Sequence, residues 1–296
     1  MNTTPTSSGP APWVAPSLMT RGIRKLRRLA LQPLRSAGMA LGANDERILA
    51  LKNRHAGRRA FVLGNGPSLK VADLDRLEQE ITFASNKVYL AFDQTAWRPT
   101  YYSVCDKLVA RNNAQTIAAT PLNRLMSDAV RDFFGPDLPA TWVRELSVPP
   151  GEPDTVHPFS DNLLVGHYGG CSIVFNQLQM AYYMGIREVI LIGLDFSFQL
   201  PSQQVATEVP GAGYEVALRS QGEVNHFHPD YRKAGEAWAV PNMEGQRAAF
   251  RSALARFEAD GRRIVNASRT TKLDVFPRAD FDALVPNPPQ KAGIST

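Results

Sequence analysis

The chain has 296 residues, of which 44% are hydrophobic and 21% charged, a composition typical of a globular protein with a sizeable core. No window approaches eighteen consecutive apolar residues, and the N-terminus lacks the charged and apolar regions of a signal peptide, which predicts a cytoplasmic protein without a transmembrane helix. The only cysteines, Cys105 and Cys171, are too few for a disulfide framework, and neither lies in metal-ligand spacing with a histidine, so we interpret both as reduced cysteines that serve in packing.

The net charge of +5 is unevenly distributed along the chain. Residues 1–44 contain six basic residues and no acidic residue and so carry a charge of +6. The remaining chain therefore has a net charge of −1. The six basic residues of this segment are Arg21, Arg24, Lys25, Arg27, Arg28 and Arg35. A nearly neutral body argues against extended nucleic-acid binding, which is typical of folds with a basic face.

Residues 1–43 are predicted to form an N-terminal arm. Residues 1–18 are rich in Pro, Ser, Thr and Ala, which predicts disorder. Apolar residues then recur at helical spacing beside the basic ones, which predicts a basic amphipathic helix: Ile23, Leu26, Ala30 and Leu34. Such a helix is expected either to lie on anionic lipid at the inner face of the membrane, or to pack on the domain or on a partner subunit of an oligomer.

Residues 44–285 read as one domain in which helices and strands alternate. Asn44, with Asp45 and Glu46 in the first turn, is a predicted helix start. The predicted strands are 59–64, 80–85, 100–105, 187–193 and 262–267, and the clearest helices are 172–184 and 244–260. This alternation predicts an α/β fold with a doubly wound, Rossmann-like, mostly parallel sheet and helices on both faces.

Two segments between these elements have the composition of loops. Residues 149–162 and 199–235 are rich in Pro, Gly and polar residues, and we interpret them as lids or inserts at the edge of a site. Residues 286–296 are expected to be a flexible tail.

The first predicted strand runs directly into the sequence GNGPS, residues 64–68. Gly64 and Gly66 would allow a tight turn and a close approach of a phosphate or nucleotide to backbone N–H groups, with Asn65 and Ser68 as polar neighbours. The loop lacks the third glycine of the dinucleotide fingerprint and the Gly-Lys-Ser/Thr of a Walker loop. A purely structural turn is therefore an open alternative.

Polar residues also follow the other predicted strands. Asn86, after the second strand, is interpreted as a contact for a base or ribose, and Asp106, after the third, as a contact for a ribose hydroxyl or a magnesium ion. Because the carboxyl ends of parallel strands face one crevice, these residues are expected to share a site with the GNGPS loop.

A second glycine pair precedes the predicted helix 172–184. Gly169, Gly170 and Ser172 are candidates for holding another phosphate or the transferred group at the helix N-terminus. Asp195, at the end of the following strand, is either a ligand contact or a cap or turn residue.

The ordered set of motifs resembles a known family. It comprises GNGPSL, the asparagine-bearing second strand, P-x-YY-x-x-x-D, GG-x-S with A-YYMG-x-x-E-x-x-LIG-x-D, HFHPDY and NAS-x-x-T-KLDVFPR, and it covers roughly residues 45–285. In this order the motifs resemble the MptE-like family of 6-hydroxymethylpterin diphosphokinases, and they are also similar to the bacterial CMP-sialic acid sialyltransferases. The resemblance implies a nucleotide-dependent transferase.

Each of the two activities meets a departure from its pattern. The diphosphokinases, which transfer diphosphate from ATP to a pterin with magnesium, carry a second aspartate shortly after the position of Asp106, where this chain has Lys107-Leu108-Val109. The sialyltransferases carry tyrosines after the Asp-Phe of the fifth-strand motif, where this chain has Ser197 and Phe198. Asn65 and Asn86, however, match their nucleotide-contacting asparagines.

The segment HFHPDY matches the histidine-bearing segment of the sialyltransferases. A histidine has an ordinary pKa near 6.5, so it can take a proton from an acceptor hydroxyl. Of His226 and His228 only one is expected to face the crevice, and Pro229 favours His228 because it stiffens the backbone there. Tyr231 is a candidate donor to the leaving phosphate.

These observations favour a glycosyltransferase of surface-glycan synthesis that uses a CMP-sugar donor, a histidine base and no required cofactor, with a glycan or small molecule as acceptor. The alternative is a 6-hydroxymethylpterin diphosphokinase that uses ATP and magnesium. A third interpretation is a non-catalytic nucleotide-binding module that the basic arm recruits to membrane-bound glycan machinery.

Overall fold

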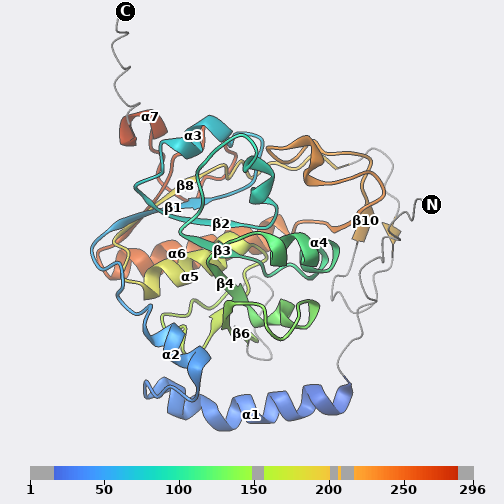
Figure 1. The fold of residues 1–296 in the computed structure, drawn as a ribbon. Coiled ribbons are helices and arrows are strands. Elements are labelled where there is room, and N and C mark those ends of the chain that lie inside the picture. The colour runs from blue at the N-terminus through green and yellow to red at the C-terminus, as the bar shows by residue number, and fades with distance from the viewer. Residues whose placement is uncertain (1–16, 149–156, 201–205, 208–216, 286–296) are drawn as a thin grey trace, which may run out of the picture.

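The computed structural model describes residues 17–148, 157–200, 206–207 and 217–285 (Figure 1). Parts of both predicted lids and the predicted tail 286–296 lie outside these ranges, as does most of the segment 1–18 for which disorder is predicted. The last residues of that segment are ordered, since Ser17 caps the first helix and Leu18 begins it.

A seven-stranded sheet in which every pair of neighbours is parallel forms the centre of the molecule, with the order β12-β8-β1-β2-β3-β4-β5. Its strands are β1 (Arg59–Leu63), β2 (Ile81–Ser85), β3 (Tyr101–Ser103), β4 (Arg124–Ser127), β5 (Ala140–Val143), β8 (Glu188–Ile192) and β12 (Arg263–Asn266). The chain winds from β1 out to β5 and then returns to place β8 on the other side of β1. The predicted doubly wound α/β fold is confirmed, and its topological switch point lies between β1 and β8.

Helices cover both faces of the sheet. Side chains alternate between the two faces along each strand, and those on both faces are apolar. Ala60 and Val62 of β1 join one core cluster, and Phe61 and Leu63 join the other. The first face packs on α2 (Ala43–Leu49), α5 (Ile173–Tyr183) and α6 (Met243–Ala259). The second packs on α3 (Val71–Asp75), α4 (Lys107–Ala119), α7 (Phe281–Leu284) and the 3-10 turns Val88–Ala91 and Asp128–Phe133.

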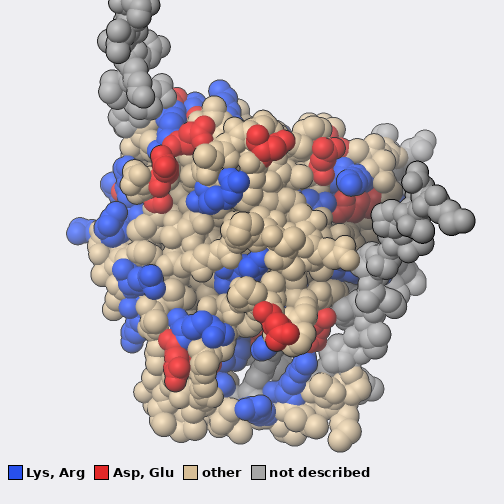
Figure 2. Space-filling view, viewed as in Figure 1, with Lys and Arg blue, Asp and Glu red and all other residues tan. Residues whose placement is uncertain are grey.

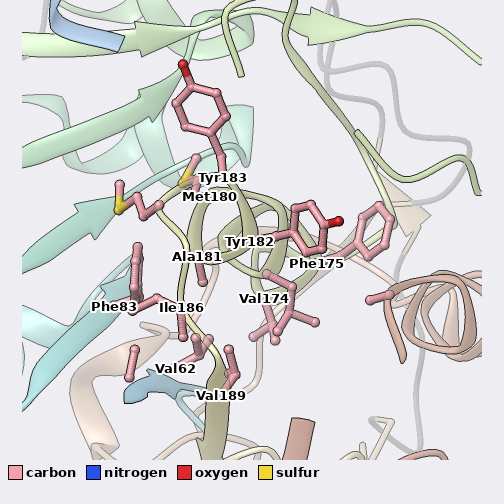
Figure 3. Close-up of a cluster of buried hydrophobic side chains, with 14 of the residues drawn as sticks. Val62, Phe83, Val174, Phe175, Met180, Ala181, Tyr182, Tyr183, Ile186 and Val189 are labelled. Atoms are coloured by element: carbon pink, nitrogen blue, oxygen red, sulfur yellow. The ribbon is translucent and has the colours of Figure 1, made fainter. Parts of the chain in front are cut away.

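Figure 3 shows how α5 enters the first core. Val174 and Ala181 point toward Val62 and Val189 of the sheet, whereas Tyr182 and Phe175 extend away from it. Residues 174–183 are all buried, and among them the polar side chains of Gln177 and Gln179 donate to the backbone carbonyls of Ala84 and Tyr168.

The remaining strands form two small sheets outside the central one. β6 (Glu145–Leu146) pairs with β7 (His167–Tyr168), next to the N-terminus of α5. β9 (Ala206–Thr207), β10 (Ala217–Arg219) and β11 (Ala237–Ala239) form an antiparallel sheet within the predicted lid 199–235 and just beyond it. This insert leads through the 3-10 turn Pro229–Tyr231, which carries part of the predicted histidine segment.

The helix start expected at Asn44 differs slightly in the structure. α2 begins at Ala43 with Gly42 at its cap position, and it ends at Leu49. The Asn44 side chain instead accepts from the backbone N–H of Trp142 and donates to the carbonyl of Trp142, both at 2.8 Å, so it ties α2 to the edge strand β5.

The predicted amphipathic helix is α1 (Leu18–Ser36), which lies along one side of the body (Figure 1). In the ranges that the structure describes, no helix is both long enough and apolar enough to cross a bilayer.

Candidate functional site

A cavity of about 500 Å3 lies at the carboxyl edge of the central sheet, over the switch point between β1 and β8. Eleven of the thirteen residues singled out from the sequence line it: Gly64, Asn65, Gly66, Asn86, Asp106, Gly169, Gly170, Ser172, Asp195, His226 and Tyr231. The other two, Ser68 and His228, are not among its lining residues. The structure thus brings together residues from six separate segments, as expected for a ligand site of an open α/β sheet.

The GNGPS loop is held against the loop that follows β8. The N–H of Gly64 donates to the carbonyl of Ile192, and the N–H of Gly66 donates to the carbonyl of Gly193, both at 2.8 Å. The expectation that these N–H groups meet a phosphate therefore needs correction, because they are already bonded within the protein. The loop offers the cavity its Asn65 side chain instead.

The two glycines are required by this loop-to-loop packing. A Cβ atom at Gly64 would overlap the carbonyl oxygen of Gly193, and a Cβ at Gly66 would overlap the carboxylate of Asp195. A bulkier residue at either place would push the two loops apart at the switch point.

Asp195 acts as the anchor between these loops. Its Oδ2 accepts from the backbone N–H of Ser68 at 3.1 Å and from the Ser68 hydroxyl at 2.9 Å, and its Oδ1 accepts from the Thr270 hydroxyl at 2.7 Å. This geometry supports the interpretation of Asp195 as a turn residue, and it explains why Ser68 faces the protein rather than the cavity.

Asn65 and Asn86 place polar atoms at the cavity that the protein does not satisfy. The Asn65 amide donates to the Ser85 carbonyl at 3.3 Å, but the buried Oδ1 atoms of both asparagines lack a hydrogen-bond partner among the described residues. Asn86 has a φ of 53°, a backbone conformation that asparagine adopts more readily than most residues. A buried acceptor without a partner costs about 1–3 kcal/mol, so a ligand that donates hydrogen bonds here would recover that energy.

The helix N-termini at the cavity are capped by their own side chains. The Asp106 carboxylate accepts from the N–H groups of Leu108 and Val109 at 2.7 and 3.1 Å and caps α4. The Ser172 hydroxyl accepts from the N–H of Val174 at 3.3 Å and caps α5. Asp106 makes its helix end unfavourable for an anion, whereas the neutral Ser172 leaves the positive end of the α5 dipole open to one.

The two glycines before α5 differ in their surroundings, since Gly170 is tightly packed and Gly169 has space beside it. A Cβ at Gly170 would overlap the Phe175 ring and lie 2.7 Å from Cβ of Ala249, so this position must be glycine for α5 to pack on α6. At Gly169 the nearest atom would be Oε1 of Glu145 at 3.7 Å, and the chain there borders the cavity.

His226 is the histidine that reaches the cavity. Its Nδ1 lies 2.9 Å from Oε2 of Glu223, a carboxylate that is 1% exposed, and its ring stacks on Tyr231 with centroids 3.8 Å apart and planes 5° apart. Burial lowers the pKa of His226 below the usual 6.5, and the Glu223 carboxylate partly opposes that shift. His226 is therefore neutral at pH 7, and Glu223 is in close contact with one of its ring nitrogens, although the two atoms do not meet hydrogen-bond geometry.

Glu223 itself stays ionised. Burial alone would raise its pKa, but the contacts with His226, the Asn225 backbone and Arg232 hold the pKa below its usual value. This arrangement of a base oriented by a buried carboxylate is typical of catalytic histidines.

Tyr231 is also buried at the cavity. Burial raises the pKa of its hydroxyl, while hydrogen bonds with the Asn86 side chain and the Lys87 backbone act in the opposite direction. The Nζ atom of Lys87 lies 5.9 Å from the ring centroid and pairs with Glu236 at 2.9 Å, which links the insert to the body. The Tyr231 hydroxyl is therefore a protonated donor at neutral pH.

His228 has a local structural role. Its Nδ1 accepts from the N–H of Asp230 at 3.1 Å and caps the turn Pro229–Tyr231. The preference for His228 over His226 as the base is not supported by this placement, although the expectation that only one of them faces the crevice agrees with it.

Several cavity residues were not singled out from the sequence. Glu145 of β6 accepts from the Ser127 hydroxyl at 3.1 Å, and it stands near Cys105 together with Asp106. Burial, and then these two carboxylates, raise the pKa of the Cys105 thiol well above its usual range, so the thiol is not a nucleophile. No cluster of three or more metal-ligating side chains occurs within the described ranges.

Comparison of the chain with protein-family models, with curated proteins and with solved structures finds no match. The resemblance to the MptE-like family therefore depends on the sequence motifs, and the function has to be argued from the cavity.

Proposed function

We propose that this protein is a glycosyltransferase that moves a sugar from a CMP-linked donor to a hydroxyl of a glycan or small-molecule acceptor in surface-glycan synthesis. One observation carries the proposal. A single cavity is lined by the neutral histidine His226 together with the unsatisfied side-chain oxygens of Asn65 and Asn86, and the buried carboxylate of Glu223, outside the lining, lies 2.9 Å from Nδ1 of that histidine.

The two asparagines suit the nucleoside end of the donor. Their Oδ1 atoms are acceptors, and a cytidine supplies donors in its amino group and its ribose hydroxyls. Because the N–H groups of Gly64 and Gly66 are engaged, the phosphate is better accommodated at the N-terminus of α5, beside Ser172.

The chemistry follows from the state of His226. The Glu223 carboxylate lies beside Nδ1 and favours the ring proton on that atom, which leaves Nε2 to accept a proton. As the acceptor oxygen bonds to the anomeric carbon of the sugar, the proton passes to His226, and the bond to the donor phosphate breaks with its electron pair remaining on the phosphate. Tyr231, which keeps its proton at neutral pH, can donate a hydrogen bond to the phosphate oxygen that leaves the sugar. General-base catalysis of this kind is typically worth about 10²–10⁴-fold in rate.

A specific observation supports the second candidate, an ATP- and magnesium-dependent diphosphokinase. Glu145 adds a carboxylate to Asp106 at the cavity, although the chain lacks the second aspartate expected after Asp106. Both carboxylates have partners within the protein, but carboxylates are the ligands that magnesium prefers.

A thermal-shift panel of CMP, UDP, GDP and ATP, each with and without magnesium, tests the proposal. A ligand at 100 times its Kd stabilises the folded state by about 2.7 kcal/mol, so selective binding is readily detected. We expect stabilisation by CMP that does not depend on magnesium. Stabilisation by ATP only in the presence of magnesium would support the diphosphokinase and contradict the glycosyltransferase.

A second measurement separates an enzyme from a binding module. A glycosyltransferase supplied with CMP-sugar donors is expected to release CMP slowly by hydrolysis even without an acceptor. Binding of CMP with no release from any CMP-sugar tested would favour the non-catalytic module.

A further inference from the structure

Helix α1 exposes a row of large apolar side chains. Of the eight large hydrophobic residues that are exposed in the described part of the chain, five lie on α1: Met19, Ile23, Leu26, Leu29 and Leu34. Ile23 is 55% exposed and Leu26 69% exposed, and their spacing along the helix places them on one side of it. Single exposed apolar residues are ordinary, but a contiguous row on one helix indicates an interaction surface.

The charge of this segment is entirely positive. Residues 18–36 contain all six basic residues of the N-terminal arm and no acidic residue. Figure 1 shows α1 at the bottom of the molecule. In the same view in Figure 2 this part shows mostly uncharged residues, with Lys and Arg residues on the side where α1 faces the body. An apolar row beside basic residues is complementary to an anionic lipid surface.

A cleft of about 550 Å3 separates α1 from the body and adds to this charge. Five arginines line it with two aspartates: Arg24, Arg27, Arg35, Arg131, Arg144, Asp128 and Asp132. Asp132 pairs with Arg24 at 2.9 Å, but no carboxylate of the described residues forms an ion pair with Arg27 or Arg131. The cleft is therefore a basic recess behind the apolar row.

The C-terminal end of α1 is fastened to the domain. Nε of Arg35 lies 2.7 Å from Oδ2 of Asp45, and Arg144 pairs with the other oxygen of the same carboxylate at 2.9 Å. Asp45 is on α2 and is buried, so these pairs are shielded from solvent. Whatever α1 binds would hold the whole domain in one orientation.

We propose that α1 docks the protein on an anionic lipid bilayer, with its apolar row in the interfacial region and the arginines of the adjoining cleft facing the lipid phosphates. The proposal is independent of the reaction in the cavity, because it rests only on the exposure, charge and anchoring of α1.

Co-sedimentation of the full chain with vesicles tests it. We expect binding to phosphatidylcholine vesicles that contain phosphatidylglycerol, weaker binding as salt is raised, and little binding to phosphatidylcholine alone. Failure to bind the anionic vesicles at low salt would overturn the proposal.

A matched pair of leucines separates insertion from plain charge attraction. Leu26→Gln should weaken binding on the order of tenfold, since it replaces an apolar side chain at the lipid boundary, whereas Leu200→Gln, at an exposed leucine that is not part of α1, should leave binding unchanged. Arg27→Gln should reduce binding and its salt dependence. If Leu26→Gln binds as tightly as the wild type, the apolar row does not enter the bilayer and the proposal is wrong.

A second copy of the chain is the competing occupant of the same surface. Light scattering in the absence of lipid distinguishes the two. A wild-type dimer that Leu26→Gln converts to a monomer would assign the row to a subunit interface and overturn membrane docking, while an unchanged oligomeric state in both proteins supports it.

Discussion

The Glu223 carboxylate lies 2.9 Å from Nδ1 of His226, and the two residues are only three positions apart in the insert between β10 and β11. The pair is oriented by the short turn that joins it and by the stacking of His226 on Tyr231, which is buried. A base fixed in this way costs little reorganisation when it takes a proton. Its position at the cavity makes the first two predictions possible.

Replacing each histidine separately tests which one is the base. His226→Gln should lower the rate of sugar transfer by about 10²–10⁴-fold, because the proton acceptor is lost. His228→Gln is the matched control, since His228 caps a turn and does not line the cavity. The assay measures sugar transfer from a donor that carries the nucleotide identified in the thermal-shift panel. Equal rates for the two variants would remove His226 from the mechanism.

Glu223→Gln should change the pH dependence of kcat/KM in a defined direction. The carboxylate raises the pKa of His226 against burial and against the positive charges of Arg232 and Lys87. Without it the pKa of His226 falls further, so the acidic limb of the pH profile should move to lower pH. The maximal rate should also fall, because the imidazolium formed during transfer loses its partner. A limb that moves to higher pH, or does not move, would contradict this role for Glu223.

Asn86→Gly should weaken nucleotide binding on the order of tenfold with little loss of stability. Glycine accepts the φ of 53° at this position, so the change removes the side chain while the backbone keeps its conformation. Asn53→Gly is the matched control, because Asn53 has a φ of 56° and does not line the cavity. Isothermal titration with the preferred nucleotide gives the affinities, and equal affinity in both variants would show that Asn86 does not contact the ligand.

Gly66→Ala should destabilise the protein by about 1–3 kcal/mol, because the added Cβ overlaps the Asp195 carboxylate. Gly135→Ala is the control, since a Cβ there meets no atom within 4 Å. In the double variant Gly66→Ala, Asp195→Ala the overlap with the carboxylate is gone, so its loss of stability should be smaller than the sum of the two single losses. Additive losses in urea unfolding would contradict the packing explanation.

Much of the central sheet could be predicted because its strands are runs of buried apolar residues. All five predicted strands occur, as do the helices of 172–184 and 244–260 within one or two residues at each end. β4 was missed because it contains Arg124, whose guanidinium donates to the carbonyls of Ile117 and Ala118 at the end of α4. A charged residue that is satisfied by the end of the preceding helix conceals a buried strand from pattern analysis.

The cavity could be located from the sequence, but its internal contacts could not. The rule that parallel strands end at one crevice was enough to bring Asn65, Asn86 and Asp106 together. The bonds that use the N–H groups of Gly64 and Gly66 depend on β8, which is more than 120 residues further along the chain, as Ser68 and Asp195 illustrate at a separation of 127. His228 was favoured because of Pro229, although a histidine followed by Pro-Asp can also cap a turn, as it does here.

The stability of the fold should fall as the pH is lowered from 7.5 to 5, and His167 should account for much of the change. Burial lowers the pKa of His167 from 6.5 to about 4, and its Nδ1 lies 2.7 Å from the Asn176 amide. Above pH 6.5 the histidine is neutral in both states, so stability is complete. Between pH 6.5 and 4 the unfolded chain takes up a proton that the folded chain does not, which favours unfolding.

These pKa values correspond to a loss of about 2 kcal/mol by pH 5. In His167→Gln this contribution is absent, so its free energy of unfolding should depend less on pH by about that amount, even though the variant is less stable at pH 7.5. The remaining slope should come from His55 and His226, whose pKa values burial also lowers. Urea unfolding of both proteins at the two pH values measures the difference, and parallel losses in wild type and variant would show that His167 is not the group that titrates.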